Sequence, residues 1–186
     1  MPKFKSVPHT DEIMTAIDYF YDTVEELGSE VNEAYENMPE SLKSGDRGTT
    51  LEHTAGLLEN IQQDIFGQGI SEEIEQRLKQ LPAVTYYTLS LPGKKAGLES
   101  RATRMSNGVS AGRAVIDEVQ KWIDEERKLL ATPLDMSEEP SEGAVKLVET
   151  MRAEHSSHLD DIEDWCHDFE EHVVIADSCE FPGMFG

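Results

Sequence analysis

Three of the six histidines, His155, His158 and His172, fall on one stripe of a helical pattern near the C-terminus, where apolar residues are expected. His155 and His158 are three residues apart. This spacing places two imidazoles on one helical face, as binding of a metal such as zinc requires. No third ligand at metal spacing can be read from the sequence. The alternative is that these histidines lie at the wet edge of a thin core and hydrogen-bond to carboxylates of a facing helix. We favour this alternative and keep His155 and His158 as candidate metal ligands.

The motifs of several enzyme classes are missing or badly placed. A carboxylate di-metal centre needs a Glu-x-x-His pair on each of two inward-facing helices. The nearest pattern, Asp164-x-x-His167, points outward if Ile162 faces the core. Cys166 and His167 are adjacent, so on a helix their side chains point in different directions. No Gly-rich phosphate loop, G-x-S-x-G elbow or H-E-x-x-H helix occurs. We therefore expect a non-enzymatic protein without a cofactor.

Many carboxylates lie on the opposite side of the helix that this C-terminal pattern predicts. They are Asp160, Asp161, Glu163, Asp164, Asp168, Glu170 and Glu171. Such a face commonly keeps a protein in solution. Negative charge fixed on a rigid helix can also resemble the phosphate rows of duplex DNA and occupy the basic groove of a DNA-binding enzyme. We therefore treat Asp160, Asp161, Asp164 and Asp168 as candidate partner-binding residues, and a basic nucleic-acid-binding protein as a candidate partner.

The composition limits the possible partners and the size of the core. The chain has 186 residues, with 16 Lys and Arg against 38 Asp and Glu, a formal net charge of −22. This charge repels phosphate backbones and anionic membranes, so direct binding to nucleic acid or a membrane is not expected. The length suits one compact domain, and an apolar share of 38% predicts a thin core. We expect a single helical domain over residues 1–186.

Half of the basic residues lie in one stretch, residues 93–132, which contains eight of the 16. Between residues 94 and 116 only one residue is acidic, whereas five are basic: Lys94, Lys95, Arg101, Arg104 and Arg113. We expect this stretch to pair with acidic neighbouring helices. The alternative is an anion site near Arg101 and Arg104.

Apolar residues spaced by three and four predict the helices. The first stripe is Ile13, Ile17, Phe20, Val24, Leu27, Val31, Ala34 and Met38, which predicts a helix over about residues 11–38, capped by Thr10. The second is Leu51, Thr54, Leu58, Ile61 and Ile65, after a cap at Thr49 or Thr50 and before Gly67 and Gly69. A short third helix starts at Ser71 and ends before Pro82.

Two further stripes predict the long C-terminal helices. One runs from Leu98 to Leu130, where Asn107-Gly108 makes a break compete with a continuous helix. The last consists of Val148, Met151, His155, His158, Ile162, Trp165, Phe169, His172 and Ala176. Pro133 and Pro140 bracket an acidic linker between the two.

Residues 83–91 (AVTYYTLSL) have the composition of a β-strand and are followed by Pro92-Gly93. No second run of this kind occurs in the sequence to pair with them. They are either an isolated short strand that pairs with another chain, or a connector packed on the helices. We favour the connector.

These patterns predict an all-α fold, an elongated antiparallel bundle of long amphipathic helices. A helix this long commonly finds part of its partner surface on another subunit, so we expect a homo-oligomer. Residues 177–186 form an irregular apolar tail, in which Phe181, Met184 and Phe185 either dock on a partner or fold back over the bundle end. No secretory signal or membrane span is found, and the two cysteines do not suggest disulfides, so we expect a cytoplasmic protein.

One segment resembles known proteins. Residues 25–43 contain a helix ending in Asn37-Met38-Pro39-Glu40-Ser41-Leu42, followed by a turn and a second helix. This segment resembles one found in small uncharacterised acidic helical proteins of bacteria and phages. The resemblance implies an accessory or assembly protein, or an inhibitor, and it transfers no functional residue. We expect a non-enzymatic protein that binds another protein, with a DNA-mimic inhibitor and a histidine-based metal-binding protein as alternatives.

Overall fold

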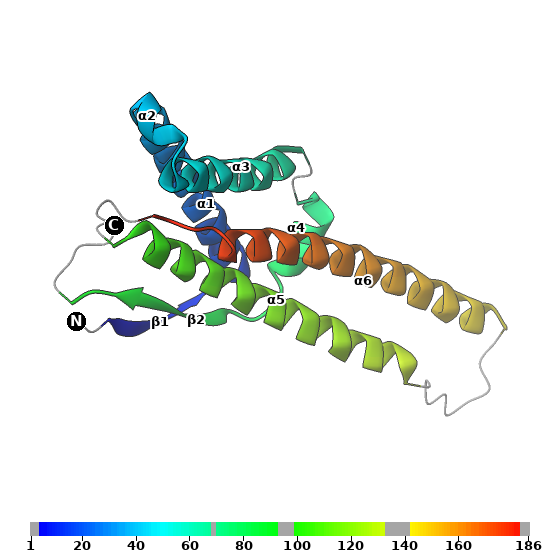
Figure 1. Cartoon of the computed structure of the whole chain (residues 1–186). Coiled ribbons are helices and arrows are strands. Elements are labelled where there is room, and N and C mark those ends of the chain that lie inside the picture. Colours follow the sequence, from blue (N-terminus) through cyan, green and yellow to red (C-terminus); the bar gives the residue numbers. More distant parts are fainter. Residues whose placement is uncertain (1–3, 68–69, 93–98, 133–141, 183–186) are drawn as a thin grey trace.

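The fold is mostly helical, with one small sheet (Figure 1). The computed structural model describes residues 4–67, 70–92, 99–132 and 142–182. Its elements are β1 (Lys5–Asp11), α1 (Ile13–Glu36), α2 (Glu40–Lys43), α3 (Asp46–Gly67), α4 (Glu72–Leu78), β2 (Val84–Ser90), α5 (Arg101–Ala131) and α6 (Glu142–Asp177). Among the described helices, none has both the length and the apolar character needed to cross a bilayer. The predicted helical character is confirmed, whereas a bundle is not.

Helix α1 carries the centre of the core and packs against α3 and α5. Its fully covered side chains are Ile13, Ala16, Ile17, Phe20, Val24, Leu27 and Val31, which confirms the predicted stripe as far as Val31. Ala34 and Met38 are only half-buried, and Met38 lies beyond the end of the helix. The helix begins two residues later than predicted, and its N-cap is Glu12. Thr10 does not cap it, because Thr10 and Asp11 pair with Thr85 and Val84 in the sheet.

The predicted bounds of the next helices need small corrections. Helix α3 begins at Asp46, and Thr49 and Thr50 lie inside it with their hydroxyls donating to the carbonyls of Gly45 and Asp46. The prediction of a cap at either threonine is therefore wrong. The predicted start of the third helix at Ser71 is confirmed, and Ser71 is its N-cap, since its hydroxyl accepts a hydrogen bond from the backbone N–H of Ile74.

The strand composition of residues 83–91 corresponds to a real strand with a partner in the same chain. β2 pairs antiparallel with β1, from Lys5 opposite Ser90 to Asp11 opposite Val84. Both the favoured connector and the isolated strand are therefore wrong. β2 alternates buried and exposed residues because one of its faces packs on α5. β1 contains no buried residue, so its sequence carries no apolar alternation that would reveal it.

Helix α5 is continuous through Asn107-Gly108, so the competing prediction of a break is wrong. The buried Asn107 side chain bonds the backbone of Leu89, accepting from its N–H at 2.7 Å and donating to its carbonyl at 3.1 Å. A Cβ atom on Gly108 would lie 3.1 Å from the Cβ of Thr23 on α1. Both residues serve contacts with neighbouring elements, which override their turn preference.

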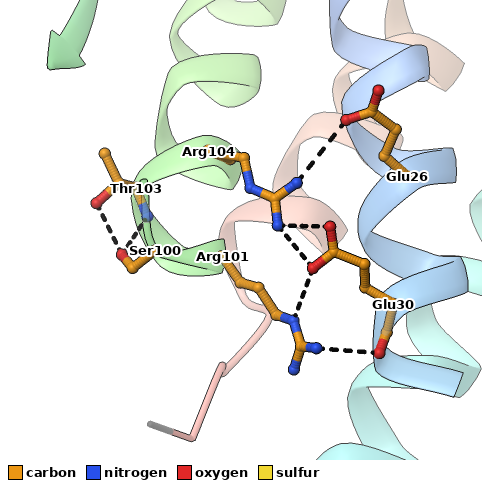
Figure 2. A network of polar contacts seen from close by, with 6 residues as sticks. All are labelled: Glu26, Glu30, Ser100, Arg101, Thr103 and Arg104. Atoms are coloured by element: carbon orange, nitrogen blue, oxygen red, sulfur yellow. Dashed lines mark hydrogen bonds and ion pairs between the residues drawn. The ribbon is translucent and has the colours of Figure 1, made fainter. Parts of the chain in front are cut away.

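The basic residues of α5 pair with carboxylates of α1, as Figure 2 shows. Arg104 donates from Nη2 to both carboxylate oxygens of Glu30, each at 2.7 Å. Arg101 donates from Nε to the same carboxylate at 3.0 Å and from Nη2 to the Glu30 carbonyl at 3.1 Å. Burial alone would raise the pKa of Glu30, but the bonds from Arg104 and Arg101 outweigh it and lower this pKa. The expected pairing is confirmed for these arginines, while Lys94 and Lys95 lie outside the described residues.

Helices α5 and α6 lie side by side and run antiparallel (Figure 1). Arg113 on α5 pairs with Asp177 near the end of α6. Arg127, further along α5, pairs with Asp160 and Glu163, which come earlier in α6. Gly112 permits the close approach of the two helices, because a Cβ atom there would lie 2.6 Å from Cγ2 of Val173.

The far end of this helical pair has no core. We call it the hairpin end, formed by residues 124–131 of α5 and 143–158 of α6, and none of its residues is buried. Leu129, Leu147 and Met151 are 65%, 60% and 60% exposed. The predicted burial of Met151 is therefore wrong, and the apolar stripe of α6 is covered only from Leu159 onward.

Candidate functional site

A cavity of about 560 Å³ opens between α1, α4 and α6. We call it the α4–α6 cavity. Its described lining residues are Tyr21, Ile70, Ser71, Glu73, Ile74, Arg77, His158, Asp161, Ile162, Asp164, Trp165, Asp168, Phe169, Glu171 and His172. The volume falls within the range of small-molecule sites in proteins.

Three aromatic side chains are among the apolar residues of the cavity lining. Trp165 and Phe169 are four residues apart on α6, and their rings stack with centroids 5.4 Å apart and planes 8° apart. Tyr21 of α1 meets Phe169 nearly edge-on, with ring centroids 5.7 Å apart and planes 70° apart. Phe169 itself is only 1% exposed, so the core fixes the position of the group. The cavity wall therefore offers rigid aromatic surface.

Tyr21 is held by a histidine at the cavity wall. Its hydroxyl lies 3.2 Å from Nδ1 of His172, and the two rings meet edge-on. Burial, with a further contribution from the charge of Asp168, raises the pKa of Tyr21. The phenol therefore remains neutral throughout the physiological range and acts as a hydrogen-bonding group.

Exposed carboxylates surround the aromatic residues. Glu73 on α4 and Asp161, Asp164, Asp168 and Glu171 on α6 line the cavity, and all five are exposed. The four on α6 follow one another at intervals of three and four residues and so share one helical face. Arg77 is the basic residue in the described lining. The cavity therefore carries a net negative charge.

The candidate metal ligands contact carboxylates of different helices. His158 approaches Glu73 of α4, with Nδ1 and Oε1 2.6 Å apart. Nε2 of His155 lies 2.9 Å from Oε2 of Glu126 on α5. These are the contacts that the alternative interpretation expected. The part of the chain that the structure describes contains no group of three His, Cys, Asp or Glu placed to hold a metal ion, and the metal hypothesis stays a prediction.

The candidate partner-binding residues separate into three groups. Asp161, Asp164 and Asp168 line the cavity, whereas Asp160 pairs with Arg127 of α5 at 3.0 Å. Phe181 is half-buried and packs on Val31, Leu51 and Ala55, the core cluster beside α3. Glu180 is fixed there too, because its carbonyl accepts a hydrogen bond from the Thr54 hydroxyl at 2.8 Å. Met184 and Phe185 lie outside the described residues.

Neither cysteine offers a reactive thiolate. Burial, together with the charges of nearby Glu170 and Glu163, raises the pKa of Cys166 to about 11. Burial alone raises the pKa of Cys179 to about 11. Both thiols therefore remain protonated near neutral pH, the form that reacts slowly.

The sequence pattern identified the acidic residues of the cavity but missed its aromatic part. The spacing predicts Trp165 and His172 on the buried stripe of the last helix, yet both are only half-buried. The covered residues are Leu159, Ile162, Cys166, Phe169, Val173 and Ala176, a stripe turned slightly away from the predicted one. The signal that could have placed Trp165 at the edge is its position between Asp164 and Asp168 on the helical surface.

Known proteins give no further guide to this site. No protein family, no curated protein and no solved structure matches the chain. The resemblance of the Asn37–Leu42 segment to bacterial and phage proteins stays a prediction.

Proposed function

We propose that this chain is a non-enzymatic interaction protein that binds a basic partner protein through the acidic surface around the α4–α6 cavity. The observation that carries the proposal is the charge of the cavity lining, where five exposed carboxylates accompany one arginine. Four carboxylates elsewhere in the fold, Glu30, Asp160, Glu163 and Asp177, pair instead with arginines of α5. The carboxylates of Asp161 and Asp164 form no hydrogen bond or ion pair with the described residues.

A hollow lined by charges of one sign concentrates its electric field and attracts ligands of opposite charge. The net charge of −22 adds a long-range attraction for any basic protein. Paired carboxylates on α1 and α6 stabilise the fold, and unpaired ones at the cavity are available to a partner. The two free cysteines suit a reducing compartment such as the cytoplasm.

The test uses a nona-arginine peptide as a basic probe, titrated calorimetrically into the full chain at rising salt. The variant Asp161→Asn/Asp164→Asn/Asp168→Asn removes three charges at the cavity. A matched control, Glu33→Gln/Glu36→Gln/Glu52→Gln, removes three exposed charges of α1 and α3, none of which belongs to the cavity lining or the hairpin end. We expect affinity to fall at least tenfold in the cavity variant and less than threefold in the control. Equal losses in both variants would mean that the chain attracts basic peptides only through its net charge.

A second candidate, a DNA mimic that inhibits a nucleic-acid-binding enzyme, is favoured by the row formed by Asp161, Asp164, Asp168 and Glu171. At a rise of about 1.5 Å per residue their spacing along α6 is about 4.5–6 Å. Phosphates recur about every 3.4 Å along one strand of duplex DNA, so the row is sparser than the surface it would imitate. Competition between this chain and duplex DNA for a DNA-binding protein separates the two functions, because a mimic must displace the DNA.

We also propose that the hairpin end is the surface of the expected homo-oligomer. It exposes Leu129, Leu147 and Met151, and it has four basic and five acidic residues. This near balance makes it far less acidic than the chain as a whole. A second copy can therefore approach here with little charge repulsion, and two such helical pairs would cover each other as a four-helix arrangement.

A further inference from the structure

The α4–α6 cavity combines three properties that recognise one class of ligand. Its wall holds the stacked rings of Trp165 and Phe169, with Tyr21 beside them. Exposed carboxylates surround these rings. Its volume, about 560 Å³, is large for a single ion and suits an organic molecule.

Each property selects for a different part of such a ligand. Aromatic faces attract cations through their negative quadrupole, and they also pack against apolar groups. The carboxylates of Asp161 and Asp164 add an attraction for positive charge and form no bond within the described chain that a ligand would have to break. A metal ion or a simple inorganic cation would leave the aromatic wall unused. A neutral apolar molecule would leave the carboxylates unused.

We propose that the α4–α6 cavity binds an organic cation, an alkylammonium or guanidinium group attached to an apolar body. The apolar body packs on Trp165 and Tyr21, which Phe169 holds in place from beneath, and the positive charge lies near Asp161 and Asp164. The proposal rests on the proposed function and deepens it, because it specifies the chemical group of the partner that enters the cavity. This group comes either from a Lys or Arg side chain of the partner or from a free organic amine.

The experiment measures Trp165 fluorescence in a Trp122→Phe background, which removes the chain's other tryptophan. Three soluble probes of similar size differ in charge: 2-phenylethylammonium, neutral 2-phenylethanol and anionic phenylacetate. We expect the ammonium probe to bind at least tenfold more tightly than the alcohol, and the anion not to bind. Equal binding of the ammonium and the alcohol would overturn the proposal.

Two variants locate the charge that makes this difference. Asp161→Asn/Asp164→Asn is expected to weaken the ammonium probe at least fivefold and to leave 2-phenylethanol unchanged. Glu33→Gln/Glu36→Gln, a pair of exposed residues three positions apart on α1, is the matched control and is expected to change neither affinity. If both variants weaken the ammonium probe equally, the cation is attracted by the whole chain and the proposal is wrong.

A fourth probe, Nα-acetyl-arginine methylamide, distinguishes the two sources of the cation. Tighter binding of this probe than of 2-phenylethylammonium supports a protein side chain, and the reverse supports a free amine. If neither binds while nona-arginine still binds, the inference fails and the proposed function stands. If the small cations bind while nona-arginine does not, the proposed function fails and the inference stands.

Discussion

Nη2 of Arg104 on α5 donates hydrogen bonds to both carboxylate oxygens of Glu30 on α1, and it lies 2.7 Å from each of them. The side chains of Arg104 and Glu30 are 18% and 39% exposed, so this contact is partly shielded from water. It joins two helices whose contacts form a large part of the core. Electrostatics within this acidic chain therefore contributes to its fold as well as to its surface.

Replacing Glu30 by Gln should destabilise the fold, because it removes the carboxylate charge that pairs with both Arg104 and Arg101. We expect a loss of about 1–3 kcal/mol in the free energy of unfolding, measured by urea denaturation at pH 7. The control is Glu26→Gln, since Glu26 is 72% exposed and lies 3.8 Å from Arg104. It should cost less than about 0.5 kcal/mol.

The same variant gives a pH-dependent difference whose sign is fixed. Although burial alone would raise it, the bonds from Arg104 and Arg101 hold the pKa of Glu30 below its ordinary value of 4.5. The ionised carboxylate therefore stabilises the fold above this pH, and the stabilisation is lost as the pH falls through the lowered pKa. The stability gap between wild type and Glu30→Gln should be full at pH 7 and should shrink below about pH 4.5. A gap that widens in acid would contradict this.

Replacing two helical glycines by alanine should change the stability of the fold in opposite directions. At Gly112 an added Cβ atom would lie 2.6 Å from Cγ2 of Val173, a short side chain with little freedom to move. Gly112→Ala should cost about 1–3 kcal/mol through overpacking between α5 and α6. At Gly56 nothing lies within 4 Å of the added atom, so Gly56→Ala should stabilise α3 by about 0.5–1 kcal/mol. Thermal denaturation of both variants provides the comparison.

Asn107 should attach the sheet to α5. Asn107→Ala removes both hydrogen bonds to the backbone of Leu89 and leaves its N–H and carbonyl without those partners. We expect a loss of about 1–3 kcal/mol, together with faster hydrogen exchange at the Leu89 amide. Ser110→Ala is the control, because Ser110 accepts only one exposed bond, from Tyr87 at 3.3 Å. Equal effects of the two variants would mean that Asn107 has no special part in holding β2.

The hairpin end should mediate self-association. We expect sedimentation velocity to show dimers of the wild type that strengthen with salt, because salt screens the repulsion between acidic copies. Leu147→Gln/Met151→Gln should be monomeric with an almost unchanged melting temperature, since both side chains are 60% exposed. Leu42→Gln, which changes an exposed residue of α2, should remain dimeric. A wild type that stays monomeric at high concentration would contradict the proposed oligomer surface.

The sequence predicted those features that depend on local periodicity. The stripe of α1 is an example, because each turn of a helix buried along one side must carry an apolar residue. Features that depend on tertiary contacts escaped prediction. Asn107-Gly108 has the sequence of a turn, and only its contacts with Leu89 and Thr23 explain why it lies inside a helix. β1 escaped because it buries no residue.

Of the candidate site, the acidic residues could be predicted from the sequence, whereas the cavity could not. Asp161, Asp164 and Asp168 stand out in the sequence as a charged face. The cavity itself arises where α4 lies opposite α6, with His158 in contact with Glu73. Nothing in the spacing of residues along α6 specifies what faces it across space. The aromatic part of the site could therefore be found only in the folded chain.

Chemical-shift mapping of the ¹⁵N-labelled chain with nona-arginine tests most directly whether the acidic surface of the α4–α6 cavity is the binding site. We predict that the largest shifts occur at the amides of residues 71–77 and 161–172 and at the indole N–H of Trp165. Shifts spread evenly over the acidic surfaces of α1, α5 and α6, or concentrated away from the cavity, would contradict the proposed site.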